Sequence, residues 1–188
     1  MIRAISRLRR AEGFGLVELL IAMTVLSVAI LAVVAGFSSG YVAINRATRV
    51  SSASALADAQ MERFRALTYT WICLSSASTE STYTASAPTG TAVPTCSTTD
   101  GALVPIQDPK AGPDGRSYRI DTYAVWNCPV GGTLSTSTPD TTTAPACRTG
   151  GTFVSSPVKL VRIVVRDHTT TSKVFAREES TFDPRTGS

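Results

Sequence analysis

The sequence Phe14-Gly15-Leu16-Val17-Glu18-Leu19-Leu20-Ile21-Ala22 opens an apolar run of 24 residues that ends at Phe37. As a helix, this run is about 36 Å long, which is enough to cross the hydrocarbon core of a bilayer. Glu18 is the only ionisable residue in the run. A charge inside hydrocarbon costs about 2.5–3.5 kcal/mol or more, so such a residue is usually functional and has a partner of opposite charge. We therefore expect a specific role for Glu18.

A cut between Gly13 and Phe14 would supply such a partner. It would create a new α-amine four residues before Glu18, close to the membrane surface. This amine, in the same chain or in a neighbouring subunit, is the natural counter-charge for the Glu18 carboxylate.

Basic residues, a glycine, a phenylalanine and a glutamate stand in a fixed order at this end of the chain. Arg9-Arg10 precede Gly13, Phe14 follows it, and Glu18 is the fifth residue when Phe14 is counted as the first. Over residues 7–37, this pattern resembles the class III signal of type IV prepilins and of type II secretion pseudopilins. The resemblance implies three processes: removal of a short leader by a prepilin peptidase, N-methylation of Phe14 by the same enzyme, and assembly with other pilin or pseudopilin subunits through Glu18 and Phe14.

Two other interpretations of the run remain open. An ordinary secretory signal would also have a basic start and an apolar core, with Val33-Val34-Ala35 as its cleavage site. A plain single-pass anchor would explain the length. The run is longer than the usual core of a secretory signal, and a plain anchor gives Glu18 no role. Under either alternative the protein would be a secreted or membrane-anchored binding domain.

The distribution of charge predicts the orientation in the membrane. The four arginines of residues 1–13 precede the run, so we expect a cytoplasmic N-terminus and a single-pass precursor in the cytoplasmic (inner) membrane. The head would face outward, and the processed subunit would reach a pilus or pseudopilus at the cell surface. The whole chain has a net charge of +4, of which residues 1–13 carry +3. The basic character therefore belongs mainly to the leader and does not indicate nucleic-acid binding.

Three regions follow along the chain. We predict a cleaved leader at residues 1–13, a long helix at 14–68 that spans the membrane at about 14–37, and a globular head at 69–188. In the second half of the helix, apolar residues recur on one side at 100° per residue. They are Val42, Val50, Ala53, Leu56, Ala57, Phe64 and Leu67.

Four cysteines lie beyond the apolar run, and an even number of exported cysteines predicts two disulfides. The candidates are Cys73, Cys96, Cys128 and Cys147, and three pairings are possible. We expect the sequential pairing, which closes two loops of about 20 residues, each worth about 3 kcal/mol in the chain-entropy model. No Cys-x-x-Cys spacing occurs and there is one histidine, so we expect no metal site.

The head shows the alternation typical of β-strands. Residues 117–127 alternate, residues 159–166 are rich in β-branched side chains, and residues 173–182 follow after a hairpin loop at 167–172. An antiparallel sheet of three or four strands packed on the amphipathic helix gives an α+β fold. The pilin resemblance implies the same layout.

The rest of the head lacks apolar periodicity. Residues 75–100 and 131–145 are dominated by Ser, Thr, Ala and Pro, so we expect surface loops there. Residues 108–115 form a turn cluster. Its two aspartates, with Asp121, are an alternative calcium site, although turn chemistry alone explains them.

The sequence favours a structural protein over an enzyme. It has no Gly-x-Ser-x-Gly, P-loop or His-Glu-x-x-His motif, and we expect no cofactor. His168 lies in the hairpin loop and is expected to be a solvated turn residue. Glu178 and Glu179 are neighbours in a strand, so they face opposite sides and cannot form a carboxylate pair.

We therefore predict a structural subunit of a type IV pilus or a pilus-like filament of type II secretion or competence, most simply a minor pilin or pseudopilin. A surface adhesin or DNA-uptake subunit would share the same signal. The ligand of the head stays open. Trp71 and Trp126 are candidate contacts for one, although core packing is the expected role of both.

Overall fold

The computed structural model describes most of the chain outside the leader. The described residues are 15–98, 100–128, 133–134, 147–149, 152–155 and 157–184. The chain divides into two compact units, residues 1–46 and residues 47–188, and we call the second one the head unit. Helix α1, Leu16–Arg65, has 50 residues and contributes to both units. The leader, Gly13 and Phe14 lie outside the described residues.

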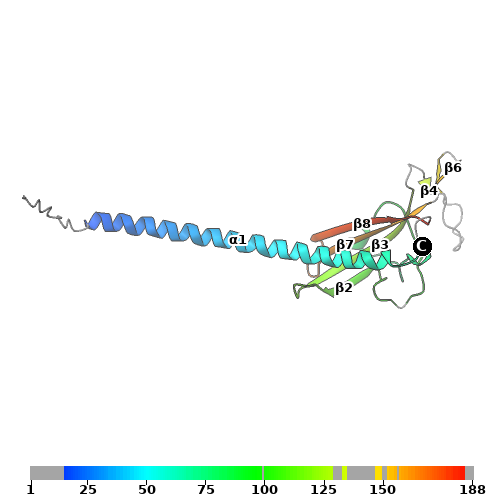
Figure 1. Cartoon of the computed structure of the whole chain (residues 1–188), viewed down its shortest axis with the longest axis horizontal. Helices are drawn as coiled ribbons and strands as arrows, with labels where there is room; N and C mark the ends of the chain where they lie inside the picture. Colours follow the sequence, from blue (N-terminus) through cyan, green and yellow to red (C-terminus); the bar gives the residue numbers. More distant parts are fainter. Residues whose placement is uncertain are drawn as a thin grey trace, which may run out of the picture. The chain divides into compact units, whose positions relative to one another are not determined.

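The head unit combines helices with two antiparallel sheets. After α1 the elements are η1 (Tyr69–Trp71), α2 (Ser81–Thr84), β1 (Thr91–Ala92), β2 (Ile106–Ala111), β3 (Ser117–Asn127), β4 (Thr133–Leu134), β5 (Cys147–Thr149), β6 (Thr152–Ser155), β7 (Val158–Asp167) and β8 (Val174–Phe182). The larger sheet has the order β1-β3-β7-β8, and β2 also pairs with β3 (Figure 1). The smaller sheet is β4-β5-β6.

Two of the predicted strands, β3 and β7, form the centre of the larger sheet, and the third one, β8, lies at its edge. β3 and β7 pair over ten residues, with Ile120 opposite Val165 and Ala124 opposite Val161. Such pairs of β-branched and apolar side chains are the unit of sheet stabilisation. The hairpin between β7 and β8 is closed by Asp167, whose carboxylate accepts hydrogen bonds from the backbone N–H groups of Thr169 (2.9 Å) and Thr170 (3.1 Å).

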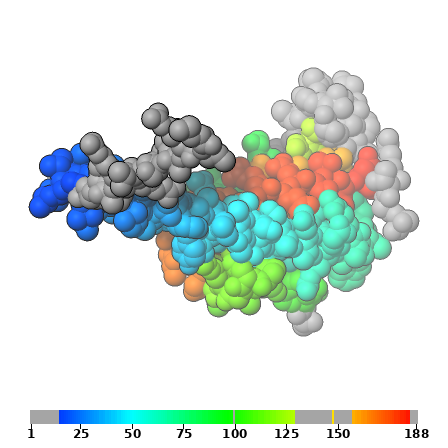
Figure 2. Space-filling view, turned by 60° about the vertical axis from the view of Figure 1, so that its left-hand side comes forward, coloured from blue at the N-terminus to red at the C-terminus, as the bar shows by residue number. Residues whose placement is uncertain are grey.

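The main core lies between the second half of α1 and one face of this sheet. Figure 2 shows this part of α1, coloured cyan, lying across the head unit between β8 in red and β2 in green. The helix contributes buried side chains at the predicted spacing, and the sheet contributes those of alternate positions in β3 and β7. These residues are Ala53, Ala57, Met61, Phe64, Tyr118, Ile120, Ala124, Trp126, Val161, Ile163 and Val165.

The opposite face of the sheet is also covered, which the sequence analysis did not predict. The segment expected to be a surface loop, residues 75–100, contains α2 and β1 and packs on this face through Tyr83. The ring of Tyr83 stacks on that of Tyr123 at a centroid distance of 4.3 Å. The two hydroxyls donate to backbone carbonyls, that of Tyr83 to Thr122 (2.6 Å) and that of Tyr123 to Tyr83 (2.8 Å). Strand β3 is therefore buried on both faces.

A charged network fills part of this second face. Asp121 is fully buried and accepts hydrogen bonds from the Nε atoms of Arg119 (2.7 Å) and Arg166 (2.6 Å). Arg119 also donates to Glu80 (2.6 Å), at the start of α2, and Arg166 donates to the hydroxyl of Ser86. The network thus ties the 80–86 segment to the sheet. Because both Asp121 oxygens are engaged, this carboxylate is not a calcium ligand.

The two disulfides follow the predicted sequential pairing, Cys73–Cys96 and Cys128–Cys147. The first one closes the loop that carries α2 and β1. Its position is fixed by the adjacent backbone, where the N–H of Cys96 donates to the carbonyl of Leu74 (3.0 Å). The covalent link and the charged network therefore hold the same segment on the sheet.

Three local expectations need correction. Trp126 is buried as expected, but Trp71 is 56% exposed. The turn cluster begins later than predicted, because β2 continues to Ala111 and the chain reverses before Gly115, which has a φ of +74°. His168 is not simply solvated, since its Nδ1 pairs with the Asp108 carboxylate.

Lys159 is a buried cation in β7. Its ammonium donates to the carbonyls of Tyr69 (2.7 Å) and Ile72 (2.9 Å). It also lies 4.7 Å from the ring centroid of Tyr69 and 5.1 Å from that of Trp126, within the range of cation–π attraction. Burial lowers the pKa of Lys159 to about 8. The side chain connects η1 to the sheet.

The first prediction concerns the buried network. Asp121→Asn removes the charge that balances two buried guanidinium groups, so we expect the free energy of unfolding to fall by about 3–5 kcal/mol. Glu179→Gln is the control, because Glu179 forms a partly exposed pair with Arg162 (2.9 Å) whose loss costs about 1 kcal/mol or less. The measurement is urea denaturation of the full chain in non-ionic detergent, followed by tryptophan fluorescence. Equal losses for the two variants would contradict the assigned role of Asp121.

The second prediction concerns pH. The unfolded chain has an ordinary lysine pKa of about 10.4, so between pH 8 and pH 10 the unfolded state binds more protons at Lys159 than the folded state. The free energy of unfolding therefore rises with pH through this contribution. Lys159→Met cannot titrate, so the stability of the wild type relative to this variant should increase from about pH 7.5 to about pH 9.5. A constant or falling difference would show that burial does not lower this pKa.

Candidate functional site

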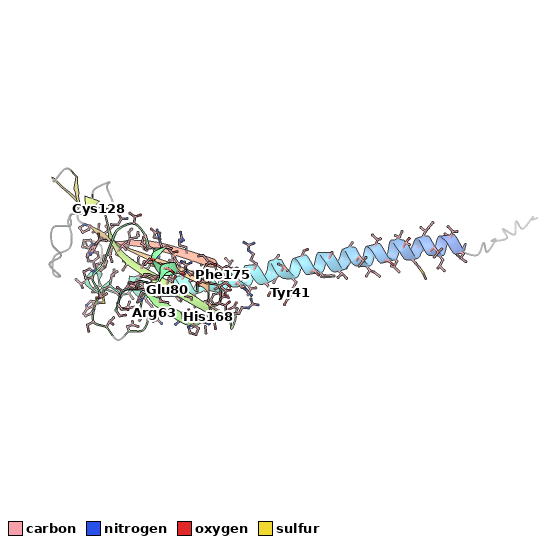
Figure 3. The ribbon with its side chains drawn as sticks, turned by 180° about the vertical axis from the view of Figure 1, so that it is seen from behind. Tyr41, Arg63, Glu80, Cys128, His168 and Phe175 are labelled. Atoms are coloured by element: carbon pink, nitrogen blue, oxygen red, sulfur yellow. A yellow bond between two sulfur atoms is a disulfide. The ribbon has the colours of Figure 1, made fainter. Side chains whose placement is uncertain are left out.

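The first half of α1 carries an unusual amount of exposed apolar surface. Its large apolar side chains from Leu16 to Ile44 are 53–76% exposed and point outward around the helix (Figure 3). Among the described residues, α1 is the one helix that is long and apolar enough to cross a membrane. Monomeric soluble proteins rarely leave a continuous apolar surface of this kind in water. This segment therefore requires either lipid or other apolar helices around it.

The neutral polar side chains of this segment suit such surroundings. Each serine and threonine hydroxyl donates to a backbone carbonyl of the preceding turn of the helix: Thr24 to Ile21 (2.8 Å), Ser27 to Met23 (2.8 Å), Ser38 to Val34 (3.0 Å) and Ser39 to Ala35 (3.1 Å). No water is needed to satisfy these donors, which is the condition for burial in lipid or between helices. The sequence analysis overlooked this feature, although the type of residue and its position in a helix were sufficient to predict it.

Glu18 is the exception in the segment. It lies in the first turn of α1, where the partial positive charge of the helix N-terminus favours a carboxylate. Among the described residues, none donates a hydrogen bond to its side chain. Gly13 and Phe14, the other two residues predicted for this site, lie outside the described part of the chain. A buried Glu18 therefore needs a cation from elsewhere.

Comparison with known proteins identifies the signal around Glu18. Residues 8–34 match the family model described as the prokaryotic N-terminal methylation motif. No curated protein and no solved structure matches the chain. The chain thus carries the prepilin-type signal of type IV pilins and pseudopilins. Its long N-terminal helix and small antiparallel sheet form an α+β, pilin-like layout.

The described acidic side chains of the head unit are mostly paired with basic ones. Among the described residues, no three His, Cys, Asp or Glu side chains are grouped so that they can hold an ion. Glu178 and Glu179 face opposite sides of β8, as predicted, and pair with Arg65 (3.4 Å) and Arg162 (2.9 Å), respectively. Glu178, Glu179 and His168 thus each pair with another side chain of the head unit.

Proposed function

We propose that this chain is a structural subunit of a type IV pilus or of a pilus-like filament of type II secretion or competence, in the manner of a minor pilin or pseudopilin. One observation carries the proposal. Within the matched N-terminal methylation motif, α1 exposes apolar side chains on all sides and bears one carboxylate in its first turn.

The proposed assembly uses two kinds of interaction. The apolar residues after Glu18 bury against helices of other subunits, and close packing stabilises the bundle because lipid tails alone give apolar helices no preference for each other. The Glu18 carboxylate pairs with the N-terminal amine of a neighbouring subunit. Since this pair is buried and specific, a subunit shifted along the filament axis would leave two buried charges unpaired, which costs several kcal/mol. The pair therefore sets the axial register.

Processing and membrane anchoring precede assembly. A prepilin peptidase removes residues 1–13 and methylates Phe14. Residues 14–37 hold the subunit in the cytoplasmic membrane until assembly, with residues 69–188 outside. The ion pairs that Glu178, Glu179 and His168 form within the head unit support a structural role for these side chains.

The third prediction concerns processing. We expect the mature chain to begin at Phe14 and to carry one extra methyl group on its amine. Gly13→Val should leave the precursor uncut, because a branched side chain crowds the bond to be cleaved. Intact mass and N-terminal sequencing of the membrane-associated protein test both statements. A mature chain that begins at Gly36 would instead identify an ordinary secretory signal.

The fourth prediction concerns Glu18. Glu18→Ala should insert in the membrane and be processed, because the span becomes more apolar and the cleaved bond is unchanged, but it should not enter filaments. Glu18→Gln keeps the size and removes the charge, so it should behave in the same way. The measurement is the amount of processed subunit in the membrane and in sheared filaments when the other subunits are present.

Ser27→Ala is the matched control for these variants. It alters a polar residue of the same segment whose hydroxyl bonds only within the helix, to the Met23 carbonyl, so filament recovery should be normal. Normal recovery of Glu18→Ala in filaments would refute the proposed ion pair.

A further inference from the structure

The head unit contains a hollow where two turns of the sheet approach α1. Its volume is about 210 Å³. It is bounded by α1 through Arg49, by the start of β3 through Arg116 and Tyr118, and by the β7–β8 turn through Asp167 and His168. Figure 3 places His168 and Phe175, another lining residue, at the same end of the head unit. The three contributing segments are far apart in the sequence, so the sequence analysis did not predict this site.

Aromatic side chains form the apolar wall of the hollow. Phe175 packs edge-on against Tyr118, with a centroid distance of 5.8 Å and an interplanar angle of 76°. The ammonium of Lys173 lies 5.1 Å from the Phe175 ring centroid and adds a positive charge beside this wall. The Tyr118 hydroxyl donates to Asp114 (2.7 Å), which holds the ring in place.

The carboxylates in and beside the hollow, those of Asp167 and Asp114, accept hydrogen bonds from residues of the adjacent turns and strand. Asp167 accepts hydrogen bonds from the backbone N–H and the hydroxyl of Thr169 (2.9 and 2.7 Å), and these bonds hold the pKa of Asp167 below its usual value. Burial acts to raise the pKa of Asp114, but the hydrogen bond from Tyr118, the backbone hydrogen bonds and the charge of Arg116 together outweigh it and lower that pKa. Both carboxylates therefore stay ionised and are used within the fold.

Two arginines each lie within ion-pair distance of one of these carboxylates. Arg49 Nη1 lies 3.6 Å from Asp167, and Arg116 Nε lies 3.9 Å from Asp114. Among the described residues, no acceptor forms a hydrogen bond with the guanidinium of Arg49. A guanidinium presents five N–H donors in a planar fork that matches the two oxygens of a carboxylate. The hollow thus combines an apolar wall with a guanidinium that forms an ion pair with Asp167 but has N–H groups left for a further acceptor.

We propose that this hollow binds a carboxylate through Arg49, with the attached carbon chain against Phe175. The carboxylate is borne either by an acidic side chain of a neighbouring filament subunit or by a small free molecule. The first source rests on the proposed function. A phospholipid headgroup does not fit, because Arg49 is 12 residues beyond Phe37 and therefore about 18 Å further along the helix, past the interfacial layer of a membrane.

The first arm of the test uses the full chain in non-ionic detergent, without filaments. Sodium acetate is titrated at constant ionic strength, with sodium chloride as the balancing salt, and the arginine Nε–H signals are followed by NMR. We expect a saturable shift of the Arg49 and Arg116 signals, and no saturable shift of Arg63, an exposed arginine of the same helix (Figure 3). Arg49→Gln should weaken acetate binding about tenfold, as followed at the signal of the neighbouring Arg116. Shifts that are linear in acetate and equal at all three arginines would overturn the proposal.

The second arm separates the two sources. Arg49→Gln and the control Arg63→Gln are produced with the other filament subunits, and processed protein is measured in sheared filaments. About tenfold lower recovery of Arg49→Gln alone identifies the ligand as a neighbour's carboxylate. Normal recovery together with saturable acetate binding identifies a small free carboxylate. If the wild type itself is absent from filaments, the proposed function is wrong. The acetate titration then still tests whether the hollow binds a carboxylate. Near-ultraviolet circular dichroism confirms that the variants keep the native fold.

Discussion

One helix in this chain has to satisfy two different surroundings. From Leu16 to Ser39, α1 exposes apolar side chains on all sides apart from Glu18, and its serine and threonine hydroxyls bond back to the helix, so this part is suited to places without water. From Ala53 to Phe64, the same helix buries only one side, against the sheet. Every other part of the structure depends on this change, because it determines which residues are free to contact lipid or other subunits and which hold the head unit together.

The head unit is stabilised on both faces of one sheet. The α1 face is apolar, whereas the other face combines stacked tyrosines with the buried Arg119–Asp121–Arg166 network. The Cys73–Cys96 disulfide closes the segment that covers this second face. A small domain gains from such a covalent link, since the cross-link restricts the unfolded chain. A segment with the composition of a loop is thereby held as part of the fold.

The success of the sequence analysis followed the strength of each periodic signal. The long helix and the strands at 117–127 and 159–166 were predictable because their apolar residues recur at helical or strand spacing. The sequential disulfides were also predicted. The packing of Tyr83 was not, because the surrounding Ser- and Thr-rich segment has no periodicity. The arginines of β3 and β7 alternate with apolar residues in a pattern that normally places charges in solvent, so their burial was not predictable either. The hollow at Arg49 depends on tertiary structure, and no local pattern encodes it.

The central claim is that Glu18 meets the N-terminal amine of another subunit in the filament. Zero-length carbodiimide cross-linking of intact sheared filaments, followed by peptide mass spectrometry, tests it most directly, because the reagent joins only a carboxylate and an amine that already touch. We expect an amide bond between Glu18 and the N-terminal residue of a neighbouring subunit, and loss of this product when filaments are dissociated in detergent before the reaction. Recovery of an unmodified Glu18 peptide from intact filaments that are cross-linked at other sites would contradict the account.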